Sequence, residues 1–524
     1  MADPVVTVKN GKLRGKTAKN YDGEEYYSFQ GIPYAKPPIG SLRFKPPVPS
    51  QSWEGIRDAT KEENDCIFYD VVLKKISGSE DCLYLNVYTK QLPVKNKALK
   101  PVMFWIHGGG FKLGSGSSIL HGPDFLLTKD IVLVTINYRT GLLGFLNFED
   151  SSLEVPGNMG LKDQLLALKW VRENISQFNG DINNVTIFGG SSGAVSVHYL
   201  LLSPLAKDLF HKCIMQSGCI SSWWANGHRS LPYLIKVLKK DVSEKDVLSI
   251  LNDMTASEVV NLQTKFSDVC EPWFKRCIGP VIEYKSTSAI LTEDPDLILR
   301  SGNYNQVPMI IGFTSREGMV FDVYAIGNTE CTHSVQDFES VIPHTIRPSM
   351  KNEYVRVTAD KIKKFYYGDQ ESTEDNKNQF YLLHGDVSVV WPIYRTIKQH
   401  NSVSKTPIYL YRMSFESTLN FIKKMLKIDT PGVAHGDELS YFFKNIFIPE
   451  IIPNSIEEKI IKTCVNLWTN FAIYGNPNSP HKDSLINVYW KPTERNNLHY
   501  LDIGENITTG INPDENRINF WDEL

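Results

Sequence analysis

The chain has 524 residues, of which 42% are hydrophobic, so it can bury a large core without disulfides or metal ions. Its formal net charge of -3 excludes a general attraction for nucleic acid or for anionic lipid. No apolar run reaches the length of a membrane-spanning helix, and the first residues lack the features of a signal peptide. We therefore expect a cytoplasmic protein, or a secreted one if the chain begins after a removed leader.

Apolar, β-branched runs alternate with segments of helical periodicity along the chain. Apolar residues at 161, 165, 168, 171 and 175 predict an amphipathic helix between Gly160 and Phe178. Strands that are apolar on both faces and alternate with helices indicate a mostly parallel α/β sheet covered on both sides. We expect one domain over 1–524, with more polar helical insertions at about 231–301 and 328–381. The predicted strands are 102–106, 131–136, 185–188, 213–215, 308–313 and 408–413.

A glycine triplet, Gly108–Gly110, follows His107 directly after the first of these strands. Glycines allow main-chain N–H groups to approach a substrate oxygen, which is what an oxyanion hole requires. A glycine triplet alone usually marks a flexible loop, but this one leaves a buried strand. We expect Gly109 and Gly110 to donate, together with the N–H of Ser192.

The third predicted strand runs into the pentapeptide Gly189–Gly193, and an apolar helical stretch follows it. Strand, glycine-flanked serine and helix together are typical of the nucleophile elbow of an α/β-hydrolase. Ser191 has glycine at both two-residue offsets, whereas Ser192 has Ala194 ahead of it. The sequence therefore predicts Ser191 as the nucleophile.

A serine nucleophile needs a histidine base and a carboxylate that orients it, and in this fold they follow the serine in the order acid, histidine. Glu317 lies in the loop after the strand 308–313 and is the expected acid, with Asp322 as the fallback. His435 follows the last long strand and is the expected base. His384 precedes that strand, and we interpret it as a histidine near the surface at the start of a helix.

From end to end, the chain resembles the type-B carboxylesterases, the family that includes the cholinesterases, and insect α-esterases in particular. The resemblance places the acid on Glu317 and the base on His435. It implies acyl-pocket aromatics at Trp224, which matches the position best, and Trp223, for which core packing is the alternative. Cys66 and Cys82 match a pair that forms a disulfide in secreted relatives, so their oxidation here depends on the compartment. The motifs that carry the resemblance are Phe29–Ala35, Glu80–Val87, Asn137–Arg139, Gly157–Gln164, Gln216–Gly218 and Gly475–Pro477.

Three departures from the family pattern bear on function. Gly190 stands where the family usually has a glutamate, and Ser192 replaces the usual alanine. We expect Gly190 to alter rate or water positioning, and the Ser192 hydroxyl to crowd or bond within the oxyanion hole. The loop between Cys66 and Cys82 is short and has no tryptophan, which argues against a quaternary-ammonium substrate.

These features predict a serine carboxylesterase that hydrolyses small, hydrophobic esters, either lipid-like or xenobiotic, through an acyl-enzyme. No metal or organic cofactor is required, and no nucleic-acid partner is implied. Two alternatives remain open at this point. One is a binding protein on the same fold. The other is a slow esterase that acts mainly by sequestering ligands or organophosphates, which Gly190 and Ser192 make plausible.

Overall fold

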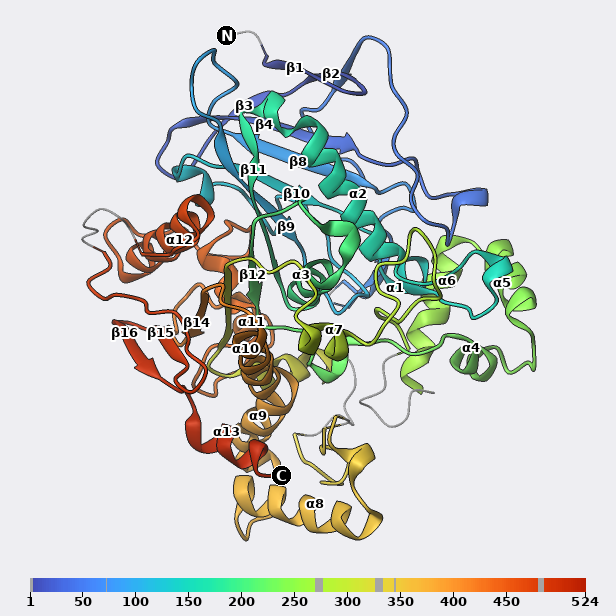
Figure 1. Cartoon of the computed structure of the whole chain (residues 1–524), viewed down its shortest axis with the longest axis vertical. Helices are drawn as coiled ribbons and strands as arrows, with labels where there is room; N and C mark the ends of the chain where they lie inside the picture. Colours follow the sequence, from blue (N-terminus) through green and yellow to red (C-terminus); the bar gives the residue numbers. More distant parts are fainter. Residues whose placement is uncertain (1–2, 72, 269–276, 326–332, 344, 479–484) are drawn as a thin grey trace.

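The computed structural model describes residues 3–71, 73–268, 277–325, 333–343, 345–478 and 485–524. Within these ranges a sheet of eleven strands runs through the middle of the molecule (Figure 1). Its strands are β3 (Lys16–Lys19), β4 (Glu25–Pro33), β8 (Tyr84–Thr89), β9 (Lys100–Ile106), β10 (Val132–Ile136), β11 (Gly180–Gly190), β12 (Lys212–Gln216), β13 (Met309–Thr314), β14 (Ile408–Met413), β15 (His499–Ile503) and β16 (Ile507–Ile511). Their spatial order is β16-β15-β14-β13-β12-β11-β9-β10-β8-β4-β3.

The strands from β15 to β10 run parallel, and antiparallel strands extend the sheet at both ends. Two short β-structures lie outside this sheet. They are the sheet of β1 (Val5–Val8), β2 (Gly11–Arg14) and β5 (Ile56–Asp58), and the pair β6 (Phe68–Asp70) and β7 (Lys75–Ser77).

Helices cover both faces of the sheet, as the apolar strands require. Along β9, Phe104 and Ile106 face one core, while Met103 and Trp105 face the other. The first core includes residues of α2 and α3, and the second includes residues of α12. The α-helices are α1 (Gly141–Phe145), α2 (Met159–Asn174), α3 (Ser192–Leu202), α4 (Leu231–Leu238), α5 (Glu244–Asp253), α6 (Ala256–Thr264), α7 (Pro295–Ser301), α8 (Asn352–Tyr367), α9 (Lys377–Gly385), α10 (Trp391–Val403), α11 (Phe421–Met425), α12 (Ile456–Tyr474) and α13 (Glu515–Asp522).

The expected α/β class with a mostly parallel sheet is confirmed. All six predicted strands are present, and β14 has the expected bounds, Ile408–Met413. The predicted helix from Gly160 is α2, which continues as a 3-10 turn to Phe178. Helices α4 to α7 fall within 231–301, and α8 and most of α9 fall within 328–381. Residues 269–276, 328–332 and 344 of these two segments lie outside the described residues.

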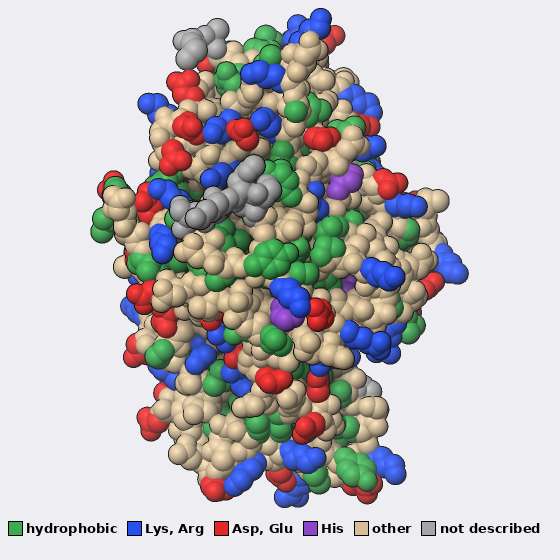
Figure 2. Space-filling model, turned by 60° about the vertical axis from the view of Figure 1, so that its left-hand side comes forward, with side chains coloured by type: hydrophobic (Ala, Val, Ile, Leu, Met, Phe, Trp, Pro, Cys, Tyr) green, Lys and Arg blue, Asp and Glu red, His purple; other side chains and the backbone are tan. Residues whose placement is uncertain are grey.

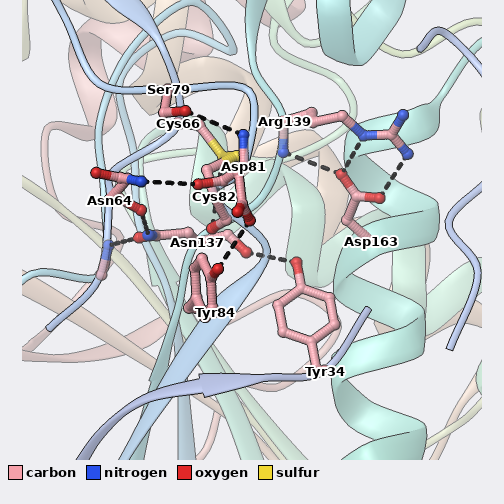
Figure 3. The surroundings of a disulfide bond; sticks show 11 residues. Tyr34, Asn64, Cys66, Ser79, Asp81, Cys82, Tyr84, Asn137, Arg139 and Asp163 are labelled. Carbon is pink, nitrogen blue, oxygen red and sulfur yellow. Dashed lines mark hydrogen bonds and ion pairs between the residues drawn. A yellow bond between two sulfur atoms is a disulfide. The ribbon is translucent and has the colours of Figure 1, made fainter. Parts of the chain in front are cut away.

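A disulfide joins Cys66 to Cys82 beside the sheet (Figure 3). Around it, residues of the family motifs contact one another. The Tyr34 hydroxyl donates to the Asn137 carbonyl at 2.6 Å, and Arg139 forms a buried ion pair with Asp163 at 2.7 Å. These contacts fix the amino-terminal strands and α2 against the parallel strands.

The surface carries charges of both signs. Figure 2 shows lysine and arginine side chains interspersed with aspartate and glutamate over one face of the molecule. Such mixing agrees with the small net charge. In the described ranges, the structure contains no helix that is both long and apolar enough to cross a bilayer.

Candidate active site

Ser191 stands at a sharp turn between β11 and α3. Its backbone has φ 55° and ψ -124°, a conformation that side chains rarely adopt and that is typical of strained functional positions. Its N–H donates to the Gln216 carbonyl at the end of β12, at 2.8 Å. The flanking glycines are required by space, because a Cβ on Gly189 would lie 2.5 Å from the carbonyl carbon of Gly193. The predicted elbow is present.

The glycine loop after β9 reaches this turn. A Cβ placed on Gly108 would lie 3.1 Å from the Ser191 Cβ, so the loop passes directly beside the serine. Gly109 and Gly110 have φ values of 115° and 60°, which glycine adopts without strain. The Ser192 side chain is fully buried. Its hydroxyl lies close enough to the Tyr138 hydroxyl to affect the pKa of that group, although no hydrogen bond of normal geometry joins them.

Glu317 is a buried, firmly held carboxylate at the start of the 3-10 helix η8 (Glu317–Ala325). Its Oε1 accepts from the Ser217 hydroxyl at 2.6 Å and from the Thr314 N–H at 2.7 Å. Sequence reasoning missed Ser217. Its contact depends on a left-handed backbone, with φ 59°, which no local sequence pattern revealed.

The second oxygen of Glu317 meets His435, whose Nδ1 lies 2.5 Å from Oε2. Burial by itself lowers the pKa of His435, but the charge and hydrogen bond of Glu317, with the charges of Glu438 and Asp437, raise it overall. The loops that carry acid and base are also joined by main-chain pairing. The Arg316 N–H donates to the Val433 carbonyl at 3.0 Å.

The fallback acid, Asp322, and the other candidate histidine, His384, do not contact Glu317 or His435 through any bond that the structure shows in the described residues; each has other partners. Asp322 bonds to His333 at 2.8 Å and accepts from the Tyr381 hydroxyl at 2.9 Å, and its side chain is 12% exposed. The interpretation of His384 as a surface residue is wrong. It is buried near the end of α9, where its ring contacts Phe321 and Phe380, and burial lowers its pKa to about 3.

The two tryptophans are buried, and Trp224 packs near Ser191. The Trp224 ring lies 2.9 Å from the position of a Cβ on Gly218, and that position is 2.6 Å from the Ser191 carbonyl oxygen. Both indoles are tied to one residue, because Trp223 donates to the Ser388 hydroxyl and Trp224 to the Ser388 carbonyl. Trp224 therefore lies beside the elbow.

The fold and the site together define an α/β-hydrolase. The defining features are the strand-turn-helix elbow and the glutamate-histidine pair, both at the carboxyl ends of parallel strands. The model of the carboxylesterase family matches residues 2–521, and the chain belongs to that family. It is accordingly a carboxylic-ester hydrolase.

Proteins named as esterases match nearly the whole chain. Esterase B1 of Culex pipiens is 35% identical over 99% of this chain and 97% of that protein. Juvenile hormone esterase of Tribolium castaneum is 35% identical over 92% of this chain and 85% of that protein. The crystal structure of juvenile hormone esterase from Manduca sexta, with OTFP covalently attached, has a TM-score of 0.85 at 27% identity and 99% coverage of both chains.

Proposed function

We propose that the protein hydrolyses hydrophobic esters through an acyl-enzyme on Ser191. The observation that carries the proposal is the 2.5 Å contact between Glu317 and His435, in loops linked to the elbow through Gln216 and Ser217. His435 takes the proton of the Ser191 hydroxyl as its oxygen attacks the ester carbonyl carbon. The tetrahedral intermediate then collapses, and the departing alcohol oxygen receives that proton. Water, deprotonated by the same histidine, releases the acid and restores Ser191.

In this proposal, main-chain N–H groups form the oxyanion hole. The N–H groups of Gly109, Gly110 and Ser192 stabilise the negative charge that develops on the carbonyl oxygen. Because glycine conformations and the first turn of α3 hold these groups, they need little reorganisation during the reaction. The chemistry requires no metal or organic cofactor.

The expected acyl side of the pocket is apolar. Trp224 beside the elbow, together with the buried Trp223 next to it in the chain, favours esters with a bulky hydrophobic acyl group, either lipid-like or xenobiotic. The relatives named juvenile hormone esterase are consistent with a lipid-like substrate. The Cys66–Cys82 disulfide favours the secreted alternative over the cytoplasmic one, since such bonds persist in oxidising compartments.

Rapid mixing with a p-nitrophenyl ester tests the acyl-enzyme. We expect a burst of p-nitrophenol equal to the enzyme concentration, followed by a steady state limited by deacylation. A steady state several orders of magnitude slower than the burst would instead support the slow, sequestering esterase, which the buried, unpartnered Ser192 hydroxyl and the missing acid at Gly190 motivate. No burst and no mass increase on the Ser191 peptide after quenching would contradict the proposal.

The pH dependence of the reaction is set by His435, whose pKa is raised above 6.5 although burial opposes the rise. Only the neutral imidazole acts as a base, so kcat/KM should increase as pH rises through that raised pKa. Glu317→Gln removes the charge that raises it. We expect the acid limb of the profile to move to lower pH and the plateau to fall by ~10³-fold. An unchanged limb would exclude Glu317 as the partner of the base.

A further inference from the structure

The residue that bonds both tryptophan rings lies in an irregular turn inside a long helix. Helix α9 continues through the π-helical turn η11 (Asp386–Val390) directly into α10. Turns of this kind are rare and are frequently found at functional sites. All five residues of η11 are buried, and Ser388 at its centre is 3% exposed. The turn therefore places a polar side chain inside the molecule, where it needs a hydrogen-bond partner.

Ser388 offers two hydrogen-bond acceptors at this point of the helix. In an α-helix its carbonyl would accept from the N–H of the residue four positions ahead, but that residue is Pro392, which has no N–H. The Trp224 indole N–H donates to this carbonyl at 3.0 Å. The Trp223 indole N–H donates to the Ser388 hydroxyl at 2.9 Å. One serine thus accepts from two tryptophans that are neighbours in the chain.

Asp386 ties the same turn to two further helices. Its carboxylate accepts from the Arg517 guanidinium of α13 at 2.7 Å and from the Tyr366 hydroxyl of α8 at 2.6 Å. Because Asp386 is 1% exposed, these charge-assisted bonds form in surroundings that exclude water and are strong. The position of Ser388 is therefore fixed by contacts of its own turn with α8 and α13.

We propose that Ser388 is a positioning residue that sets the selectivity for the acyl group by holding both indoles in one orientation. The inference rests on the proposed function, in which Trp224 lies beside the acyl group carried by Ser191. A buried indole cannot turn without breaking the hydrogen bond of its N–H, so the apolar wall that the two rings form keeps one shape. Long acyl chains contact this wall, whereas an acetyl group is too short to depend on it.

Ser388→Ala tests the proposal, because it removes the hydroxyl that accepts from Trp223 and keeps the carbonyl that accepts from Trp224. The constants kcat and KM are measured for p-nitrophenyl esters of unbranched acids from acetate to decanoate. We expect kcat/KM for the preferred long-chain ester to fall by about tenfold, mainly through a higher KM, while the value for acetate changes by less than about twofold. Ser402→Ala, at an exposed serine of α10, is the matched control and should reproduce the wild-type series.

Trp223→Phe removes the same hydrogen bond from its other end. If this bond sets the selectivity, the effects of Ser388→Ala and Trp223→Phe on selectivity should combine in the double variant to less than their product. Three results would overturn the proposal. They are equal losses for acetate and the long-chain esters, which would show a purely structural role, an unchanged series in Ser388→Ala, and fully multiplicative effects in the double variant.

A nuclear magnetic resonance measurement does not depend on turnover. In protein that carries nitrogen-15-labelled tryptophan, the indole N–H signal of Trp223 is assigned by its absence from Trp223→Phe. It should move upfield in Ser388→Ala, because the loss of a hydrogen bond shifts an N–H proton in that direction, and a signal that stays in place would also reject the inference. If the proposed function is wrong and Ser191 is not the nucleophile, Ser191→Ala retains its turnover while the Trp223 signal still moves.

Discussion

Ser191→Ala is expected to lower kcat/KM for a p-nitrophenyl ester by ~10⁴-fold or more. The variant keeps the Cβ and the backbone, so the bond from residue 191 to the Gln216 carbonyl and the Glu317–His435 pair remain in place. What it loses is the atom that forms the acyl bond. Residual hydrolysis then depends on water acting beside the intact histidine and glycine loop.

An organophosphate provides the companion measurement. In the wild type, the phosphoryl group should appear by mass spectrometry on the peptide that contains Ser191, and activity should fall in proportion. The alanine variant should take up none and should melt within a few degrees of the wild type, because alanine meets the same backbone strain as serine. Full ester turnover by the variant, or a phosphoryl group on another residue of inhibited wild type, would refute the assignment.

Gly193→Ala is expected to destabilise the protein by about 3 kcal/mol or more, or to prevent soluble expression. A Cβ at this position overlaps the Ile106 carbonyl oxygen and lies 2.8 Å from that of His107. These are main-chain atoms of the glycine loop and of β9 in the centre of the sheet, so they cannot move aside. The substitution forces α3 away from the sheet and displaces the elbow.

Gly190→Ala is the matched control in the same pentapeptide. Its Cβ has the Leu439 and Trp105 side chains as nearest neighbours, at 3.4 and 3.5 Å, which is ordinary contact. We expect a change of about 1 kcal/mol or less. Urea unfolding of both variants checks the contrast. Equal midpoints for the two proteins would mean that the close approach of Gly193 to β9 does not limit the stability of the elbow.

The chemistry-bearing residues could be predicted because their signals are local. The glycines around Ser191 predict a tight turn. Glu317 and His435 each follow an apolar segment that the sequence predicts as a strand. The assignment of these three residues as a triad stays a prediction until Ser191 is tested. The structure adds the bond between Glu317 and His435.

The sequence-based interpretation was wrong or incomplete for residues whose surroundings depend on parts of the chain far away in the sequence. His384 looks like the start of a helix, but α9 begins at Lys377 and continues through a π-helical turn into α10, which buries the histidine. Ser217 stands in the motif Gln216–Gly218, but the motif does not show what its hydroxyl contacts. Its bond to Glu317 forms only when the ends of β12 and β13 are brought together.

The main-chain hydrogen bond from Arg316 to Val433, which pairs Arg316 with Ala434 as in a parallel sheet, has a consequence for how this site can change. The loops that carry Glu317 and His435 are joined through peptide groups, so this link does not depend on which side chain stands at position 224. We therefore expect that exchanging Trp224 for smaller or differently shaped residues widens the range of accepted esters and leaves the Glu317–His435 contact in place. A library restricted to such positions should yield altered selectivity far more often than loss of turnover.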